Sequence, residues 1–232
     1  MDSKKIFMLL LMQVGLFLGV ANAQSYDKKI IPPGWKVEKT VPGHLDDNNL
    51  EDLVLILIII KNNFGETDIF EDSSRQLLLL SQTSPGKYNV QLKNSGAILC
   101  ARCGGMLGDP LQSIEIKNKV LIITHYGGSR DRWGMVHRYR FQQGDWYLIG
   151  ATYRYDDNFL LCGTTNDINL NTREMIVKGY HEDNQKILHQ TTLPIKPLPL
   201  LKTYNLETEG VKGLLVWGIK PAASGEACPK DS

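Results

Sequence analysis

Asp52-Leu-Val-Leu-Ile-Leu-Ile-Ile-Ile60 decides the fold, because eight consecutive apolar residues follow a single acid. The run is too short to cross a bilayer as a helix, for which about 20 apolar residues are needed. Its β-branched side chains favour a strand, and the lack of alternating polar positions indicates that both faces of the strand are buried. We therefore expect residues 52–60 to form a strand at the centre of the core.

Short extended runs separated by turn residues occupy much of the remaining chain. In Ser84-Pro85-Gly86-Lys87, proline sets φ and glycine supplies a positive φ, as a tight turn requires. The predicted strand pairs are 76–81 with 88–92, 113–116 with 120–125, 136–141 with 146–155, and 167–170 with 174–178. Four successive hairpins predict a mainly β protein, an antiparallel meander that is sheet-like or barrel-like. An α+β fold stays possible, because residues 69–80 could form a short helix.

The hairpin around residues 136–155 allows its two faces to be assigned. With the turn centred on Gln143-Gly144, one face pairs Phe141 with Trp146, Tyr139 with Leu148 and His137 with Gly150, which is typical of core. The opposite face then carries Arg138, Arg140, Tyr147, Ile149, Ala151, Tyr153 and Tyr155. This arginine and tyrosine face is either an ordinary solvated sheet surface or a binding face for a carboxylate-bearing or sugar-like ligand.

The N-terminus has the pattern of a secretory leader. Lys4 and Lys5 precede an apolar stretch of about 15 residues, which is shorter than the roughly 20 of a transmembrane anchor. Small residues in Ala21-Asn22-Ala23 fit signal peptidase, so we expect residues 1–23 to be removed. No cysteine follows the cut, and no membrane anchor is expected afterwards. The mature protein is predicted to be exported, either periplasmic or secreted.

Removal of the leader leaves 209 residues, which we expect to form one β-rich domain over 24–232. The leader carries two basic residues and one acid, so the mature chain has no net formal charge. That balance argues against nucleic acid as a partner. Three prolines make 193–200 an extended edge or connecting segment. A last strand is expected at 211–219, and a loose tail at 221–232.

Four cysteines lie in the mature chain, and an even number in an exported protein indicates disulfides. Proximity favours a bond between Cys100 and Cys103, which leaves Cys162 with Cys228. Two alternatives stay open for the Cys-x-x-Cys motif. It could bind zinc if His125 or Cys162 completed the ligands, or it could be a redox dithiol. The glycines and the proline over 104–110 do not fit the helix start that such a dithiol needs.

Residues 43–54, Gly-His-Leu-Asp-Asp-Asn-Asn-Leu-Glu-Asp-Leu-Val, resemble the calcium loop of FG-GAP or VCBS-type repeats. The resemblance implies calcium ligands at Asp46, Asn48 and Asp52, and a melting temperature that calcium raises. His44 stands where the first acidic ligand belongs, and Asn49 replaces the turn glycine. The alternative is a turn of similar shape in which these side chains bind backbone amides. With its other motifs, the chain also resembles a family of exported bacterial proteins, which implies no particular activity.

The densest set of reactive groups lies at 125–133, His-Tyr-Gly-Gly-Ser-Arg-Asp-Arg-Trp, read as a glycine-rich loop after a strand. A catalytic triad of His125, Ser129 and Asp131 would have to converge from one short loop, and no Gly-x-Ser-x-Gly elbow is present. A loop that contacts a ligand, or that is structural, is the stronger interpretation. Its candidate ligand-binding residues are Arg130, Arg132 and Trp133.

Two hypotheses for the function follow. The first is an exported, non-enzymatic binding protein that uses the Arg138, Arg140 and Tyr147 face or the 125–133 loop. Its partner would be a small molecule, a glycan or a protein. The second is a periplasmic hydrolase centred on His125, which requires this imidazole to lie in a pocket within reach of a hydroxyl or carboxylate.

Overall fold

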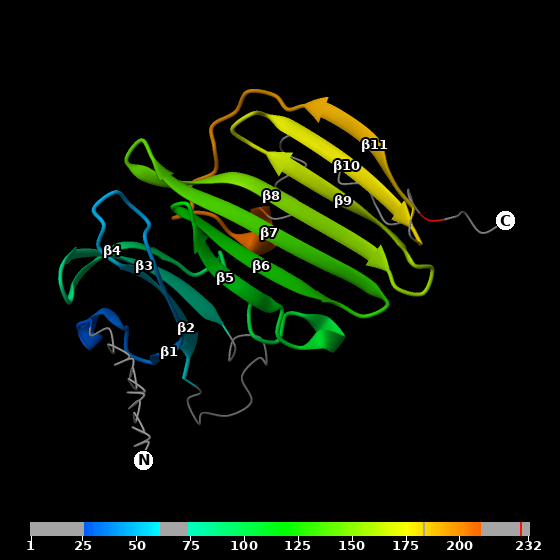
Figure 1. Cartoon of the computed structure of the whole chain (residues 1–232). Helices are drawn as coiled ribbons and strands as arrows, with labels where there is room; N and C mark the ends of the chain where they lie inside the picture. The colour runs from blue at the N-terminus through cyan, green and yellow to red at the C-terminus, as the bar shows by residue number, and fades with distance from the viewer. Residues whose placement is uncertain (1–25, 61–73, 183, 210–227, 229–232) are drawn as a thin grey trace, which may run out of the picture.

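The structure is a computed structural model that describes residues 26–60, 74–182, 184–209 and Cys228. These residues form two open antiparallel sheets (Figure 1). The smaller sheet contains, in spatial order, β1 (Trp35–Gly43), β2 (Asp52–Ile59), β3 (Arg75–Ser84) and β4 (Lys87–Asn94). The larger sheet contains, in spatial order, β11 (Asn184–Thr192), β10 (Glu174–His181), β9 (Cys162–Asn169), β8 (Asp145–Asp157), β7 (Asp131–Gln142), β6 (Val120–Gly128) and β5 (Leu111–Lys117).

Helix contributes little to the described residues. It comprises two 3-10 turns, η1 (Lys28–Ile30) and η3 (Gly105–Leu107), and one short α-helix, α1 (Leu206–Glu209). None of the helices in the described part of the chain has the length and apolar character that crossing a bilayer requires. The mainly β meander predicted from the sequence is confirmed, because every pair of neighbouring strands is antiparallel and sequential.

Strand β2 is buried on both faces, as its apolar sequence predicts. Leu53, Leu55 and Leu57 point to a small cluster beneath Trp35 and Tyr88. Val54 and Ile56 point the other way, into the main core. The side chains of these five residues are fully buried. The smaller sheet thus packs through both faces of its central strand.

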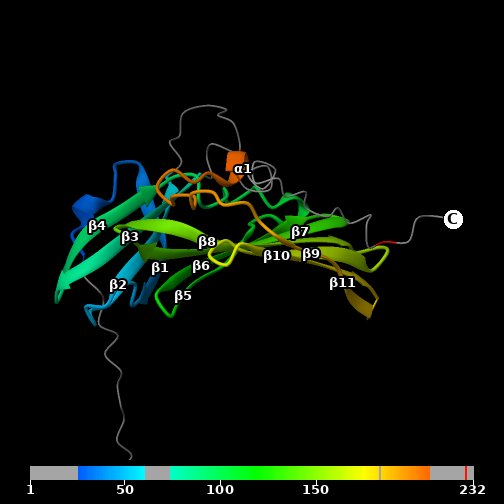
Figure 2. The same ribbon diagram turned by 90° about the horizontal axis from the view of Figure 1, so that it is seen from above.

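The main core lies between the inner faces of the two sheets. Larger-sheet residues such as Leu121, Ile123 and Leu148 pack with Leu77 and Leu79 of β3. Figure 2 shows the larger sheet nearly edge-on, with α1 and the segment leading to it along one face. Its other face, called the outer face below, is left uncovered by described elements. Figure 1 looks onto this outer face.

The predicted hairpins are all present, and their turns use the expected chemistry. Pro85-Gly86 joins β3 to β4, and Gln143-Gly144 joins β7 to β8 with positive φ at both residues. The helix considered for 69–80 is wrong where it can be seen, because Arg75–Leu80 belongs to β3. Strands β1 and β11 were not predicted, since neither has a clear alternating pattern. The leader, the expected strand at 211–219 and all of the tail except Cys228 lie outside the described residues.

The proline-rich segment connects β11 to α1 in extended form, as expected. It is held to the larger sheet by two backbone hydrogen bonds, from Leu148 N–H to Pro199 O and from Leu201 N–H to Trp146 O. The Asn94 side chain donates to the carbonyls of Leu201 and Tyr204, 2.5 and 2.8 Å away. The segment is therefore fixed to both sheets despite its three prolines.

A β-bulge in β8 overturns part of the predicted face assignment. Phe141 pairs with Trp146 and Tyr139 with Leu148 as expected, but His137 pairs with Ala151 instead of Gly150. Ile149 is the extra residue, and each residue beyond it points to the opposite side from that predicted. Ala151, Tyr153 and Tyr155 therefore belong to the inner face, and the first two are 1% exposed. Their assignment to the arginine face was wrong.

Both predicted disulfides are present. Cys100 pairs with Cys103 across a tight turn, and Cys162 at the start of β9 pairs with Cys228. The Cys162–Cys228 bond ties the distant C-terminal end of the chain to the larger sheet. A long closed loop of this kind restricts the unfolded chain and stabilises the fold.

A buried guanidinium joins the two sheets. Arg75 of β3 has a side chain only 1% exposed and donates two hydrogen bonds to Glu38 of β1, at 2.6 and 2.7 Å. It donates two more, also at 2.6 and 2.7 Å, to Asp109, which precedes β5 of the larger sheet. Burial alone would lower the pKa of Arg75, but the hydrogen bonds that it donates to Asp109 and Glu38, with their negative charges, outweigh burial and raise that pKa. Arg75 therefore stays charged between two carboxylates.

Replacing Arg75 should strongly destabilise the protein. The variant Arg75→Met removes the guanidinium that Glu38 and Asp109 share, and both carboxylates are partly exposed, so the loss should be up to about 3–5 kcal/mol, the cost of breaking a buried ion pair. Denaturant unfolding without reductant measures the loss. Lys202→Met is the matched control, because it breaks an ion pair between exposed Lys202 and Asp145 and should change stability little. Equal effects of the two substitutions would contradict the role of Arg75.

Candidate functional site

A groove on the outer face of the larger sheet contains two of the arginines singled out from the sequence. Its volume is about 430 Å³. The lining residues come from β7, β8, β9 and the turn after β9, and they are Arg138, Arg140, Ile149, Gly150, Asp167, Ile168, Asn169 and Asn171. The predicted arginine face is therefore concave where the arginines lie.

The bulge in β8 shapes this groove. It sets Gly150 opposite Arg138, so that no side chain rises from the floor beside the guanidinium stem. A Cβ atom at Gly150 would lie 3.1 Å from Ile168 O and 3.9 Å from Arg138 Cδ. Glycine at this position thus leaves room beside the arginine.

The two groove arginines are oriented by neutral partners. Arg138 Nη1 donates to Thr152 Oγ1 at 3.0 Å, and the same hydroxyl donates to Asp167 Oδ1 at 2.8 Å. Arg140 donates through Nε and Nη2 to Gln142 Oε1, at 3.3 and 2.9 Å. Among the described residues, neither guanidinium forms an ion pair with a carboxylate. Both keep N–H groups available for an anionic ligand.

The side of the groove opposite the arginines is polar, and it was not predicted from the sequence as part of a site. Asp167, Asn169 and Asn171 alternate with buried Ile168 and Leu170. That period of two places all three polar side chains on the outer face, and it was visible in the sequence. Only the pairing of β9 with β8 puts them next to the arginines.

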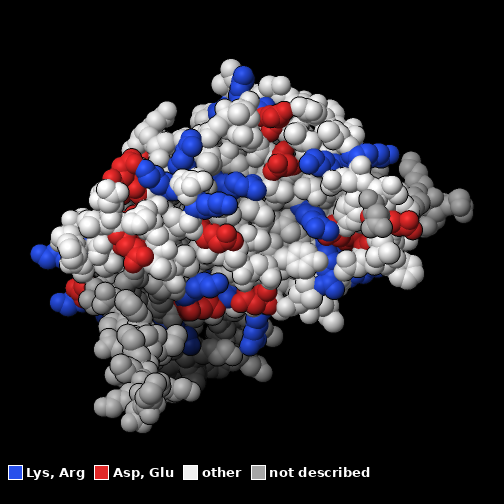
Figure 3. All heavy atoms as spheres, viewed as in Figure 1, with Lys and Arg blue, Asp and Glu red and all other residues white. Residues whose placement is uncertain are grey.

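Charges of both signs are distributed over the outer face. Figure 3, which views the molecule from the same side as Figure 1, shows basic and acidic side chains interspersed, without a large area of one sign. Such a surface does not attract polyanions over long distances. Recognition in the groove would therefore depend on local geometry rather than on overall charge.

The other candidate ligand-binding residues are divided among three places. Tyr147 pairs with Arg140 on the outer face. Arg132 lies on the same face, but it is six residues from Arg138 along β7, a distance of about 20 Å. Arg130 lies in the turn between β6 and β7, where it pairs with Asp157 at 2.8 Å and lies 5.1 Å from the centre of the Phe159 ring. Trp133 packs against Gly127. Of these four residues, the structure therefore brings only Tyr147 next to the groove arginines, opposite Arg140.

The glycine-rich segment 125–133 is mostly strand rather than loop, which corrects our prediction. The pairing of β6 with β7 continues to Gly128 and Arg132, and only Ser129 and Arg130 form the turn. Gly128 N–H donates to Gly104 O at 2.9 Å. The Cys-x-x-Cys-Gly-Gly and His-Tyr-Gly-Gly motifs therefore pack against each other, and their glycines allow this close approach.

His125 lacks the surroundings that the hydrolase hypothesis requires. Its side chain is fully buried, and its Nε2 accepts a hydrogen bond of 3.3 Å from Leu99 N–H. Its Nδ1 is buried without a partner among the described residues. Burial, followed by the nearby charge of Arg75, lowers the pKa of His125 to about 4. With this pKa the imidazole is neutral at pH 7, and no hydroxyl or carboxylate of the described residues forms a hydrogen bond with it.

His137 forms the centre of a buried polar cluster. The hydroxyl groups of Tyr153 and Tyr204 lie 3.0 and 3.1 Å from its Nε2. Burial is the largest cause that lowers the pKa of His137, to about 3, followed by the charges of His125 and Arg138. Tyr204 comes from the segment before α1, so this cluster fastens that segment to the inner face of the larger sheet.

The loop that resembles a calcium site uses its oxygens internally. Asp46 accepts from the backbone and side-chain nitrogens of Asn48 and from Ser81. Asp52 is fully buried and accepts from Leu45 N–H and Gln82 N–H, at 2.8 and 2.9 Å. Asn49 has the positive φ that its place in the pattern predicts. Calcium at Asp46, Asn48 and Asp52 stays a prediction of the resemblance.

The described residues contain no group of three or more His, Cys, Asp or Glu side chains that could hold a metal ion. Cys162 is bonded to Cys228, so it cannot complete a zinc site with Cys100 and Cys103. The helix that follows Cys103 is a single 3-10 turn, η3, instead of the α-helix whose dipole activates redox dithiols. In this structure the Cys100–Cys103 bond closes the turn in which Cys103 N–H donates to Cys100 O.

No protein-family model matches this chain, and no curated protein matches its sequence. The protein is therefore classified by its fold and its groove alone. It is an all-β protein of two open antiparallel sheets, with an arginine-lined groove on the outer face of the larger one.

Stability should depend on pH through His137. The folded pKa of about 3 lies below the value of about 6.5 expected for an unfolded histidine, so the unfolded chain binds a proton that the folded chain does not. The stabilisation is complete above about pH 6.5 and is lost as the pH falls toward 3. His137→Gln should reduce the slope of unfolding free energy against pH by about 1.4 kcal/mol per pH unit between those values. Equal slopes in denaturant titrations would contradict this.

The packing of the two glycine motifs should not tolerate a methyl group at Gly127. A Cβ there would lie 2.4 Å from Trp133 Cζ2 and 3.0 Å from Gly104 Cα. Gly127→Ala should cost about 1–3 kcal/mol of unfolding free energy by overpacking. Gly134→Ala is the control on the paired strand, because its Cβ would meet only ordinary contacts at 3.6 Å and beyond. A melting curve of Gly127→Ala that matches that of the control would refute the interpretation.

Proposed function

We propose that this protein is an exported, non-enzymatic binding protein whose groove takes a small ligand bearing a carboxylate. The observation that carries the proposal is the pair of groove guanidiniums, Arg138 and Arg140, without an ion pair among the described residues. Guanidinium groups bind carboxylates through paired, charge-assisted hydrogen bonds. A ligand carboxylate would supply the partner that the protein itself does not.

The opposite side of the groove suits hydroxyl groups. The carboxylate of Asp167 and the amide of Asn171 add acceptors and donors to the two arginines. A volume of about 430 Å³ is within the usual range for small-molecule sites. A sugar acid, with one carboxylate and several hydroxyls, matches both sides of the groove.

Export is part of the same proposal. The leader pattern in residues 1–23 supports it, and so do the two disulfides, which persist in oxidising compartments. The protein would meet its ligand in the periplasm or outside the cell.

Binding can be tested with two sugars that differ in one group, D-glucuronate and D-glucose. Calorimetric titration of the mature protein should show binding of glucuronate and at least about tenfold weaker binding of glucose, because charge-assisted hydrogen bonds contribute about 1.5–3 kcal/mol. The double variant Arg138→Gln and Arg140→Gln should lose at least about tenfold in glucuronate affinity.

Arg102→Gln is the matched control, because it removes the same charge from an exposed position outside the groove. It should bind glucuronate like the wild type. The proposal fails if both sugars bind equally, if neither binds, or if the double variant retains its affinity.

A further inference from the structure

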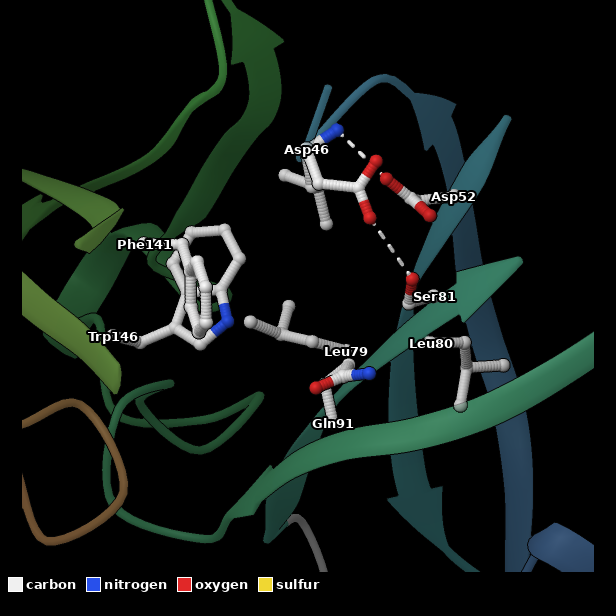
Figure 4. Close-up of a pocket in the computed structure, with 9 residues that line it drawn as sticks. Asp46, Asp52, Leu79, Leu80, Ser81, Gln91, Phe141 and Trp146 are labelled. Carbon is white, nitrogen blue, oxygen red and sulfur yellow. Dashed lines mark hydrogen bonds between the residues drawn. The ribbon is translucent and has the colours of Figure 1, made fainter. Parts of the chain in front are cut away.

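A second cavity lies where the loop 43–54 and strands β3 and β4 meet the tip of the β7–β8 hairpin. Its volume is about 110 Å³, below the roughly 300–1,000 Å³ of most small-molecule sites, so a ligand ring would lie partly outside it, against the exposed Phe141. The lining residues are Leu45, Asp46, Asp52, Leu79, Leu80, Ser81, Gln91, Phe141 and Trp146. Figure 4 shows the two aromatic rings on one side and Asp46, Asp52 and Ser81 on the other.

The aromatic wall offers an apolar surface that remains accessible. Phe141 is 44% exposed, and its ring centre lies 5.8 Å from that of Trp146, with the planes tilted by 55°. Leu45 and Leu79 continue this surface into the cavity. A flat group with an apolar face can stack on Phe141 while its edge reaches the polar side.

Trp146 provides an unused donor. The residue is only 4% exposed, and its indole N–H has no acceptor among the described residues. In Figure 4 the indole nitrogen points from the aromatic wall toward Leu79, into the cavity. The indole nitrogen is accessible from the cavity, so it is free to donate a hydrogen bond to a ligand atom there.

Asp46 provides an acceptor on the opposite side. Its carboxylate accepts three hydrogen bonds from the described residues, one at Oδ1 and two at Oδ2, of about four that two oxygens can accept. Neither Asp46 nor Asp52 forms an ion pair within the described part of the chain. The cavity therefore combines negative charge and spare acceptor capacity with the indole donor.

These groups discriminate between ligand chemistries. Asp46 and Asp52 would repel an anion. They and the aromatic rings would attract an ammonium group, but that group has no lone pair to accept from the indole N–H. A hydroxyl group both donates and accepts, so a hydroxylated ring can satisfy Asp46 and Trp146 together. Its C–H face would stack on Phe141.

We propose that this cavity binds a neutral hydroxylated ring of the pyranose type. It is a site distinct from the arginine groove, because Arg140 and Phe141 are consecutive in β7 and point to opposite faces of the hairpin. The hairpin thus carries the anionic-ligand groove on one side and a neutral sugar site on the other.

The test follows the indole resonance of Trp146 by NMR of the ¹⁵N-labelled mature protein, assigned with Trp146→Phe. The probes are the methyl pyranosides of glucose, galactose and mannose, each titrated to about 100 mM, since single rings bind in the millimolar range. At least one should shift the resonance saturably. Phe141→Ala should weaken that binding by at least about tenfold, as expected for loss of an aromatic stacking contact.

Tetramethylammonium chloride and sodium acetate are the control ligands, and neither should shift the Trp146 resonance. Trp35→Phe is the control variant, because Trp35 packs in the other apolar cluster. The double variant of Arg138 and Arg140 should bind the pyranoside normally, which separates this site from the groove. The proposal is overturned if no pyranoside shifts the resonance, if tetramethylammonium shifts it as strongly, or if Phe141→Ala binds like the wild type.

Discussion

The buried guanidinium of Arg75 is the interaction on which the arrangement of the two sheets depends. It connects β1 and β3 of the smaller sheet, through Glu38, to Asp109 at the entry of the larger sheet. A buried charge is tolerated only when it is paired, so both carboxylates must lie within reach. Arg75 also donates to Leu99 O, so the guanidinium holds both ends of the segment from Leu99 to Asp109, which carries the Cys100–Cys103 disulfide. That segment then covers His125 and packs its glycines against β6.

A single extra residue in β8 determines which side chains of that strand face the core and which face the outer groove. Because side chains alternate with a period of two, the bulge at Ile149 exchanges the two faces for the rest of the strand. Tyr153 thereby enters the core to meet His137, while Thr152 turns outward between Arg138 and Asp167. The bulge therefore supports the buried polar cluster and forms the outer groove at the same time.

The β7–β8 hairpin is the element that both binding proposals share. Its outer face presents Arg138 and Arg140 beside the polar side chains of β9, whereas its tip presents Phe141 and Trp146 to the smaller sheet. The loop 43–54 also acquires a role in this arrangement. Asp46 and Asn48 order the turn before β2, and Asp46 lines the cavity beside the aromatic pair. The loop 43–54, an incomplete calcium motif in the sequence, thus lines a cavity together with residues of several strands.

The sequence by itself determined the features that depend on near neighbours. The apolar run at 52–60 specified a strand that is buried on both faces from Asp52 to Leu57, the turn residues specified the hairpins, and spacing paired Cys100 with Cys103. The tertiary structure decided the rest, because it depends on partners far apart in the chain. Examples are the Arg75 ion pairs, the burial of His125, and the meeting of Asp167 with Arg138 through Thr152. Strands β1 and β11 pair with their neighbours in sequence, but neither has the alternating pattern that would have predicted it. The alternation of side chains along β8 predicted correctly which residues share a face only up to Ile149. Beyond it the bulge exchanges the two faces, and no clear sequence signal marks the bulge.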